Sequence, residues 1–194
     1  MKNSKIKLGF ALTGSFCTFN EVINELEKLK ETNKYDIYPI MSENAYSINT
    51  RFGDASKFNL RIAEICDRSI IHTIRDAEPI GPKKMLDILM IAPCTGNTIG
   101  KLANGVFDTP VTLAYKAHLR NKAPVVIAVS TNDALGSSAK NIGILLNNKN
   151  IYFVPMKQDN PLSKENSIVA DFSKMDEALE YALKGKQLQP ILLP

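Results

Sequence analysis

Residues 88–105 read ILMIAPCTGNTIGKLANG, a short apolar run followed by a proline and then by small polar residues. Ile88–Ala92 is apolar at every position, which is typical of a β-strand buried on both faces. Pro93 ends the run, and Thr95 stands where a helix N-cap is expected. The stretch therefore predicts a buried strand, a loop and a helix, which together form the repeating unit of a parallel α/β sheet.

The same pattern recurs on both sides of this stretch. Further apolar runs lie at Ile6–Leu12, Tyr35–Ile40, Val125–Val129 and Ile151–Val154, and apolar residues at helical spacing lie between them. Alternating strands and helices favour a doubly wound parallel sheet, because right-handed crossovers cover both faces with helices. We expect residues 1–194 to form a single domain, a Rossmann-like or flavodoxin-like three-layer sandwich. Two long polar connections, 41–57 and 156–171, are expected to be loops that act as lids or oligomer contacts.

Composition narrows the function classes. The chain has 194 residues, 44% hydrophobic and 23% charged, and its net charge of +4 comes from basic residues interleaved with acidic ones. A nucleic-acid partner is therefore not expected. No apolar run approaches the roughly 20 residues that a membrane span requires. Three cysteines without CxxC spacing argue against disulfides and a metal site and favour the reducing cytoplasm.

Two loops carry the groups that suit an anionic ligand. Thr13-Gly14-Ser15 follows the first strand, and Thr95-Gly96-Asn97-Thr98 follows the third. Ligands of open α/β sheets bind beyond the carboxyl ends of the strands, where glycine allows close approach and helix N-termini attract anions. We expect both loops to hold one phosphate. The alternatives are a tight turn capped by Ser15 or Thr18 and an ordinary helix capped by threonine.

Residues 92–108 resemble a known family. Pro93 followed by Asn97-Thr98, with Lys101, Gly105 and Asp108 beyond, is similar to the PxxxNT signature of the flavoprotein family that includes flavin-dependent cysteine decarboxylases. The resemblance implies that FMN binds here. The residues it implies for the cofactor are Thr13, Gly14, Ser15, Ser42, Pro93, Cys94, Thr95, Asn97 and Thr98.

Within that family, several segments resemble the B subunits of dipicolinate synthases. They are residues 76–84, 155–159, 169–172 and 185–190. The resemblance implies dehydrogenation of a dihydrodipicolinate-type dicarboxylate during sporulation, in the mother-cell cytoplasm. It implies a Rossmann-type A subunit as partner, which would bring NAD(P), and it implies a homo-oligomer.

The sequence also departs from the family. The decarboxylases carry a catalytic histidine near the positions that here are Glu78 and Pro79, so decarboxylation is disfavoured. Their Pro-Ala-Met-Asn stretch is here Val129-Ser130-Thr131-Asn132, in which only Asn132 matches. We expect Asn132 to face the substrate. A flavin-free scaffold or activator of the A subunit is the main alternative, and an FMN-dependent decarboxylase is a second one.

The remaining candidates are single residues. Arg51 and Arg75 are predicted substrate contacts, because guanidinium groups bind carboxylates with paired hydrogen bonds. His72 is expected to be partly buried and hydrogen-bonded, and His118 to lie on a helix surface. Cys17 and Cys94 lie on the two loops, where they are either thiols with a lowered pKa or small apolar residues.

Overall fold

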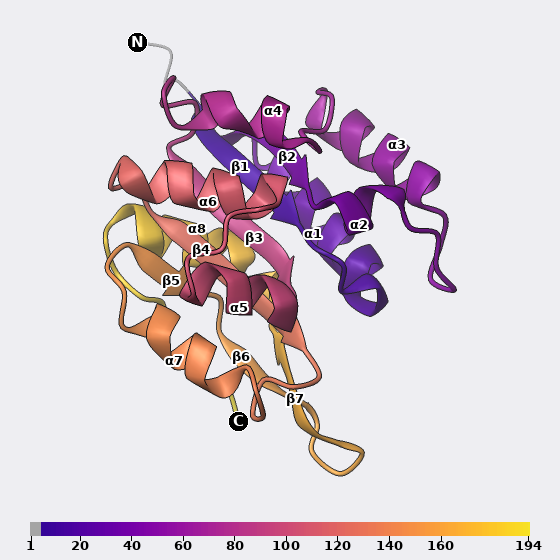
Figure 1. Ribbon diagram of the computed structural model, residues 1–194, viewed down its shortest axis with the longest axis vertical. Helices are drawn as coiled ribbons and strands as arrows, with labels where there is room; N and C mark the ends of the chain where they lie inside the picture. The colour runs from indigo at the N-terminus through magenta and orange to yellow at the C-terminus, as the bar shows by residue number, and fades with distance from the viewer. Residues whose placement is uncertain (1–4) are drawn as a thin grey trace.

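The computed structural model describes residues 5–194, and a seven-stranded sheet lies at its centre (Figure 1). The strands are β1 (Ile6–Leu12), β2 (Tyr35–Met41), β3 (Ile88–Cys94), β4 (Val125–Thr131), β5 (Ile151–Phe153), β6 (Met156–Asn160) and β7 (Lys164–Ala170). Their order is β2-β1-β3-β4-β7-β6, and β5 pairs with β4. The first five strands pair in parallel, which confirms the predicted doubly wound α/β class.

Helices cover both faces of the sheet. They are α1 (Phe19–Glu31), α2 (Glu43–Ser47), α3 (Ala55–Cys66), α4 (Ile74–Ala77), α5 (Gly96–Ala103), α6 (Pro110–Arg120), α7 (Ala139–Leu146) and α8 (Met175–Leu183). Three short 3-10 helices are η1 (Phe16–Thr18), η2 (Glu78–Ile80) and η3 (Phe172–Lys174). None of the helices within residues 5–194 is long and apolar enough to cross a bilayer.

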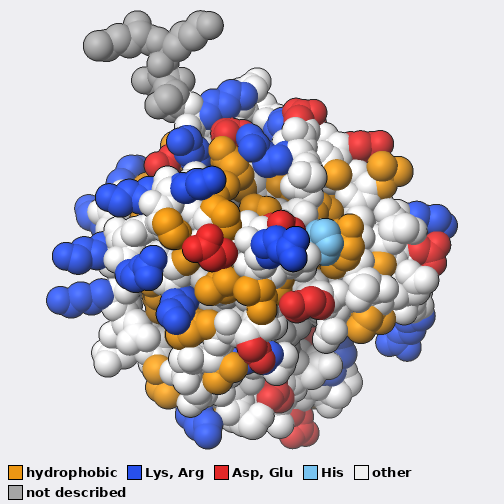
Figure 2. Space-filling view, turned by 45° about the horizontal axis from the view of Figure 1, so that its top comes forward, with side chains coloured by type: hydrophobic (Ala, Val, Ile, Leu, Met, Phe, Trp, Pro, Cys, Tyr) orange, Lys and Arg blue, Asp and Glu red, His pale blue; other side chains and the backbone are white. Residues whose placement is uncertain are grey.

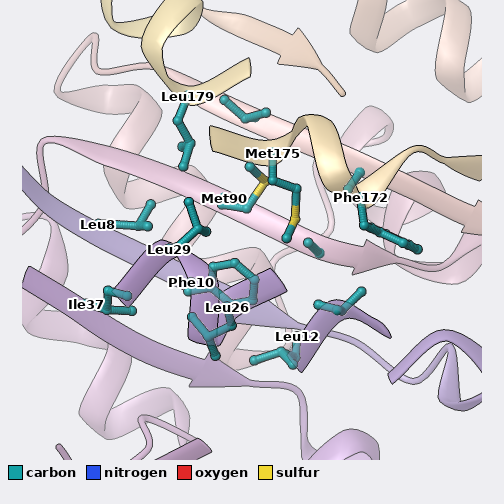
Figure 3. Close-up of a cluster of buried hydrophobic side chains, with 14 of the residues drawn as sticks. Leu8, Phe10, Leu12, Leu26, Leu29, Ile37, Met90, Phe172, Met175 and Leu179 are labelled. Carbon is teal, nitrogen blue, oxygen red and sulfur yellow. The ribbon is translucent and has the colours of Figure 1, made fainter. Parts of the chain in front are cut away.

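The core has two parts because side chains alternate across the strands. Leu8, Phe10 and Leu12 of β1 face one side, where they meet apolar residues of α1 and α8 in the cluster that Figure 3 shows. Leu89 and Ile91 of β3 face the other side and meet α5, α6 and α7. Both faces of the sheet are thus closed, so ligands are left with the ends of the strands.

Charged side chains of both signs are exposed on the surface (Figure 2). On the face in Figure 2, most of the Lys and Arg side chains lie toward the left of the view, and Asp and Glu side chains are scattered over the rest of the face. Ion pairs join several of them, for example Lys34 with Asp176 at 2.8 Å and with Glu180 at 2.6 Å.

The two connections predicted as loops contain regular structure. Residues 41–57 include α2 and the first turn of α3. Residues 156–171 form the β6–β7 hairpin, in which β7 pairs antiparallel with both β6 and β4. The prediction failed here because residues 157–166 are exposed and, apart from Pro161 and Leu162, polar. The hairpin therefore has no alternation of apolar side chains that would mark its strands.

His118 is not on the surface, contrary to expectation. It is 1% exposed, and its Nε2–H donates to the carbonyl oxygen of Pro124 at 3.0 Å. Burial lowers the pKa of His118, against the opposing effects of the Pro124 carbonyl and Asp87. The residue lies on the face of α6 that packs on the sheet, which sequence periodicity did not distinguish from its outer face.

Candidate functional site

Two cavities lie at the carboxyl ends of β1, β3 and β4. The first, of about 440 Å³, is called the N-cap cavity here because the N-cap residues Ser42, Thr95 and Thr109 line it. The second, of about 690 Å³, is called the hairpin cavity because β6 and β7 form one wall. Gly14 and Thr95 line both, so these two residues form the boundary between the cavities.

Thr13 fastens the loop after β1 to the loop after β3. Its N–H and its hydroxyl both donate to the carbonyl oxygen of Pro93, at 3.2 and 2.7 Å. The N–H of Thr95 donates to the Thr13 hydroxyl oxygen at 3.0 Å. Thr13 is 1% exposed, so these bonds are shielded from water. Its hydroxyl therefore holds the two loops in register.

The N-cap cavity presents positive ends of helices. Thr95 accepts a hydrogen bond from the N–H of Thr98 at the start of α5, and Thr109 accepts one from the N–H of Thr112 at the start of α6. Ser42 caps α2 in the same way. Unpaired N–H groups and the helix dipole attract anions at such ends. The side chains of Asn97 and Thr98 line the same cavity and add donors.

The predicted cofactor residues are divided between the two cavities. Thr13, Ser42, Asn97 and Thr98 line the N-cap cavity, whereas Ser15 lines the hairpin cavity. The Ser15 hydroxyl is 2.8 Å from that of Ser130 on β4. Pro93 and Cys94 are buried within β3 and line neither cavity.

The cysteines differ in their surroundings. Burial raises the pKa of the Cys94 thiol, so Cys94 is a small apolar residue of the core rather than an activated thiol. Cys17 is exposed and lines the hairpin cavity. Within residues 5–194, no group of three or more His, Cys, Asp or Glu side chains could hold a metal ion.

The loop after β4 is organised by one carboxylate. Asp133 accepts hydrogen bonds from the hydroxyls of Thr131 and Ser137, each at 2.5 Å, and from Ser138 at 3.1 Å. The bond from Ser137, then that from Thr131, lowers the pKa of Asp133. The carboxylate lies against Gly96, the first residue of α5, so it also fixes the start of that helix.

The hairpin cavity carries charges of both signs. Four carboxylates (Glu21, Asp133, Asp159 and Asp171) and two ammonium groups (Lys157 and Lys164) line it. Lys164 pairs with Asp159 at 2.6 Å. The pKa of Glu21 is raised, first by partial burial and then by Glu25 and Asp171, while Lys157 opposes the shift.

The structure does not bring the predicted substrate contacts together. Asn132 lines the hairpin cavity, where its Oδ1 accepts a hydrogen bond from Ser167 at 3.3 Å. Arg51 and Arg75 are exposed and line neither cavity, and the Arg51 guanidinium lies 4.9 Å from the ring centre of Phe52. Sequence reasoning missed Lys157 and Lys164, because nothing in the sequence indicates that their segment pairs with β4.

The histidines lie outside both cavities. His72 stacks on Tyr46 with ring centres 3.8 Å apart, and its Nδ1 is 3.2 Å from the carbonyl oxygen of Ile70. It is half-buried and hydrogen-bonded, as the sequence predicted. Glu78 and Pro79, at the position of the family histidine, lie in η2 and line neither cavity.

Comparison with known proteins supplies relatives for the whole chain. The model of the family described as Flavoprotein matches residues 1–179. The dipicolinate synthase B subunit of Bacillus subtilis (strain 168) is 44% identical over 187 residues, 96% of this chain and 93% of that protein. The crystal structure of the dipicolinate synthase B subunit from Bacillus halodurans C superposes with a TM-score of 0.90 at 43% identity, covering 100% of this chain and 99% of that one.

A more distant structure shares the fold. The FMN-dependent cysteine decarboxylase SpaF superposes with a TM-score of 0.68 at 21% identity, covering 92% of this chain and 95% of its own.

Proposed function

Because the chain belongs to the Flavoprotein family, we propose that it binds FMN and acts as the B-type subunit of a dipicolinate synthase. In this role it helps to dehydrogenate a dihydrodipicolinate-type precursor to dipicolinate. The likeness to the B. subtilis dipicolinate synthase chain over 96% of this one supports the assignment.

The observation that carries the cofactor proposal is the convergence of capped helix starts on the N-cap cavity. Asn97, Thr98 and Ser42 would hold the FMN phosphate there, beside the N-terminus of α5. Gly14 and Thr95, on the boundary of the two cavities, would contact the rest of the cofactor. The flavin would supply hydride acceptance, and the protein would supply its position and the exclusion of water.

The partner proposals rest on the relatives. A B subunit implies a second type of chain in the enzyme, which we infer to be a Rossmann-type A subunit that carries NAD(P). We also infer a homo-oligomer and a place in the mother-cell cytoplasm of a sporulating bacterium. The substrate is then a small dicarboxylate.

A second candidate function has its own support. Thr13 and Ser15 already use their hydroxyls in hydrogen bonds within the protein, and the family histidine is replaced. These features are compatible with a flavin-free scaffold or activator of the A subunit, because a protein can keep a fold without keeping the chemistry of its relatives. Among the described residues, no histidine lines either cavity. This disfavours the decarboxylase alternative.

Titration with FMN and with riboflavin tests the cofactor proposal, because the two differ only in the phosphate. We expect FMN to bind more tightly. Asn97→Asp should weaken the binding of FMN by about tenfold or more, because the new carboxylate repels the phosphate. The affinity for riboflavin should not change. Asn20→Asp in the first turn of α1 is the matched control, because it makes the same charge change outside both cavities.

Flavin fluorescence reports binding in these titrations. No FMN binding by the unaltered chain would favour the scaffold, provided that adding the chain to the A subunit still raises dipicolinate production. Equal weakening of FMN and riboflavin by Asn97→Asp would place the phosphate elsewhere.

A further inference from the structure

Building on the proposed function, we propose that Lys157 is the residue by which this chain recognises the dicarboxylate, in the hairpin cavity. The hairpin cavity adjoins the N-cap cavity through Gly14 and Thr95, so a molecule within it would lie next to the proposed cofactor site. A doubly anionic ligand needs cationic partners there. The two arginines predicted for this task lie elsewhere.

Of the two ammonium groups in the cavity, only one is free to bind a ligand. Lys164 is held by Asp159 in a 2.6 Å ion pair on the same hairpin. Lys157 has neither an ion pair nor a hydrogen bond from its ammonium group to any residue within 5–194. Its place on β6, opposite Val169 of β7, keeps it on the wall that faces the loop after β4.

The carboxylates of the cavity are not equivalent either. Asp133 is bonded to the hydroxyls of Thr131, Ser137 and Ser138, and Asp159 is paired with Lys164. Asp171 accepts hydrogen bonds from the N–H and the hydroxyl of Ser173, at 3.2 and 2.5 Å. Glu21 is the carboxylate of the cavity that has no such partner among the described residues. Partial burial, and then Glu25 and Asp171, raise the pKa of Glu21, and Lys157 opposes the shift. Lys157 therefore attracts an anion, whereas Glu21 repels one.

Asn132 completes the recognition from the other wall. Because its Oδ1 accepts the bond from Ser167, its amide NH2 is left to donate. An ammonium group on the hairpin and an amide donor after β4 can each take one carboxylate of a small planar dicarboxylate. A monocarboxylate can use only one of them, so the arrangement selects for two carboxylates.

Calorimetric titration of dipicolinate into the full chain, with and without FMN, tests this assignment. Lys157→Gln should weaken the binding of dipicolinate by about tenfold, because one charge-assisted contact is lost. Lys140→Gln on α7 makes the same charge change outside both cavities, so it is the matched control and should change the affinity by about twofold at most. Glu21→Gln should act in the opposite direction and tighten binding by about threefold, an effect that salt reduces.

Pyridine-2-carboxylate, which lacks one carboxylate, should bind the unaltered chain more weakly than dipicolinate and should lose less affinity in Asn132→Leu. Equal affinities of the unaltered chain and Lys157→Gln for dipicolinate would overturn the proposal, and so would the absence of dipicolinate binding to the unaltered chain. Neither result bears on whether the chain binds FMN, which is measured separately on the same variants. A chain that binds dipicolinate through Lys157 but never binds FMN would instead refute the cofactor part of the proposed function.

Discussion

Gly96 is the residue with the least room for a side chain at the site. A Cβ there would lie 2.6 Å from Asp133 Oδ1, 2.7 Å from Thr131 Oγ1 and 2.8 Å from Ser138 Oγ. These atoms are held by their own hydrogen bonds, so none can move without breaking the network around Asp133. The glycine is needed for close packing rather than for an unusual backbone conformation.

Gly96→Ala should therefore lower the free energy of unfolding by about 1–3 kcal/mol, the usual cost of forcing extra volume into a packed site. Gly143→Ala in α7 is the control, because nothing lies within 4 Å of its Cβ position. That change should raise the free energy of unfolding by about 0.5–1 kcal/mol through helix propensity. Urea denaturation measures both, and equal effects would show that the Asp133 network yields to the added methyl group.

At the scale of elements, the Thr13 hydroxyl joins β1 to the start of α5. It donates to Pro93 at the end of β3 and accepts from the N–H of Thr95, the α5 N-cap. A strand end and a helix start that are far apart in sequence thus share one buried hydroxyl. This contact sets how the two loops face each other across both cavities.

Thr13→Val keeps the shape of the side chain but removes the hydroxyl. It should lower the free energy of unfolding by about 1–3 kcal/mol, because the buried N–H of Thr95 loses its acceptor. Thr13→Ser keeps the hydroxyl and should cost less, about 1 kcal/mol for the lost methyl group. Amide hydrogen exchange at Thr95 should be faster in Thr13→Val alone, and unchanged exchange would contradict the assigned hydrogen bond.

At the scale of the whole molecule, stability should depend on pH through His118. Burial lowers the folded-state pKa of His118, so the unfolded chain binds more protons than the folded protein once the pH falls below about 6.5, the ordinary histidine pKa. The free energy of unfolding should then fall with decreasing pH, by at most about 1.4 kcal/mol per pH unit, until the folded-state pKa is reached. Carboxylates with lowered pKa values, such as Asp133, contribute a separate loss below about pH 5.

Urea denaturation between pH 5 and pH 7.5 tests this dependence. His118→Gln offers an amide in place of the Nε2–H donor to Pro124 and does not titrate. It should flatten the slope between about pH 6.5 and pH 5. A slope that persists in His118→Gln would assign the pH dependence to other groups.

The amino-acid sequence by itself determined the α/β class, the first five strands and the two loops at the site. These depend on local signals: runs of apolar residues long enough for a strand, and small polar residues where helices begin. Pro93 does not end its strand as expected, because β3 continues to Cys94. Thr95 caps its helix in agreement with this pattern, whereas the helix that Ser42 caps lies in a segment that was expected to be a loop. The hairpin of β6 and β7 carries no such signal over residues 157–166, because their side chains are exposed.

Only the tertiary structure decided which residues share a cavity. Thr13 and Ser15 are two residues apart in sequence, yet Thr13 lines the N-cap cavity and Ser15 the hairpin cavity. Arg51 and Arg75 lie away from Asn132, while Lys157 lines the same cavity as that asparagine. Periodicity records whether a residue is apolar or polar, but the partners of a polar side chain are fixed by strand order and by hydrogen bonds between segments that are distant along the chain.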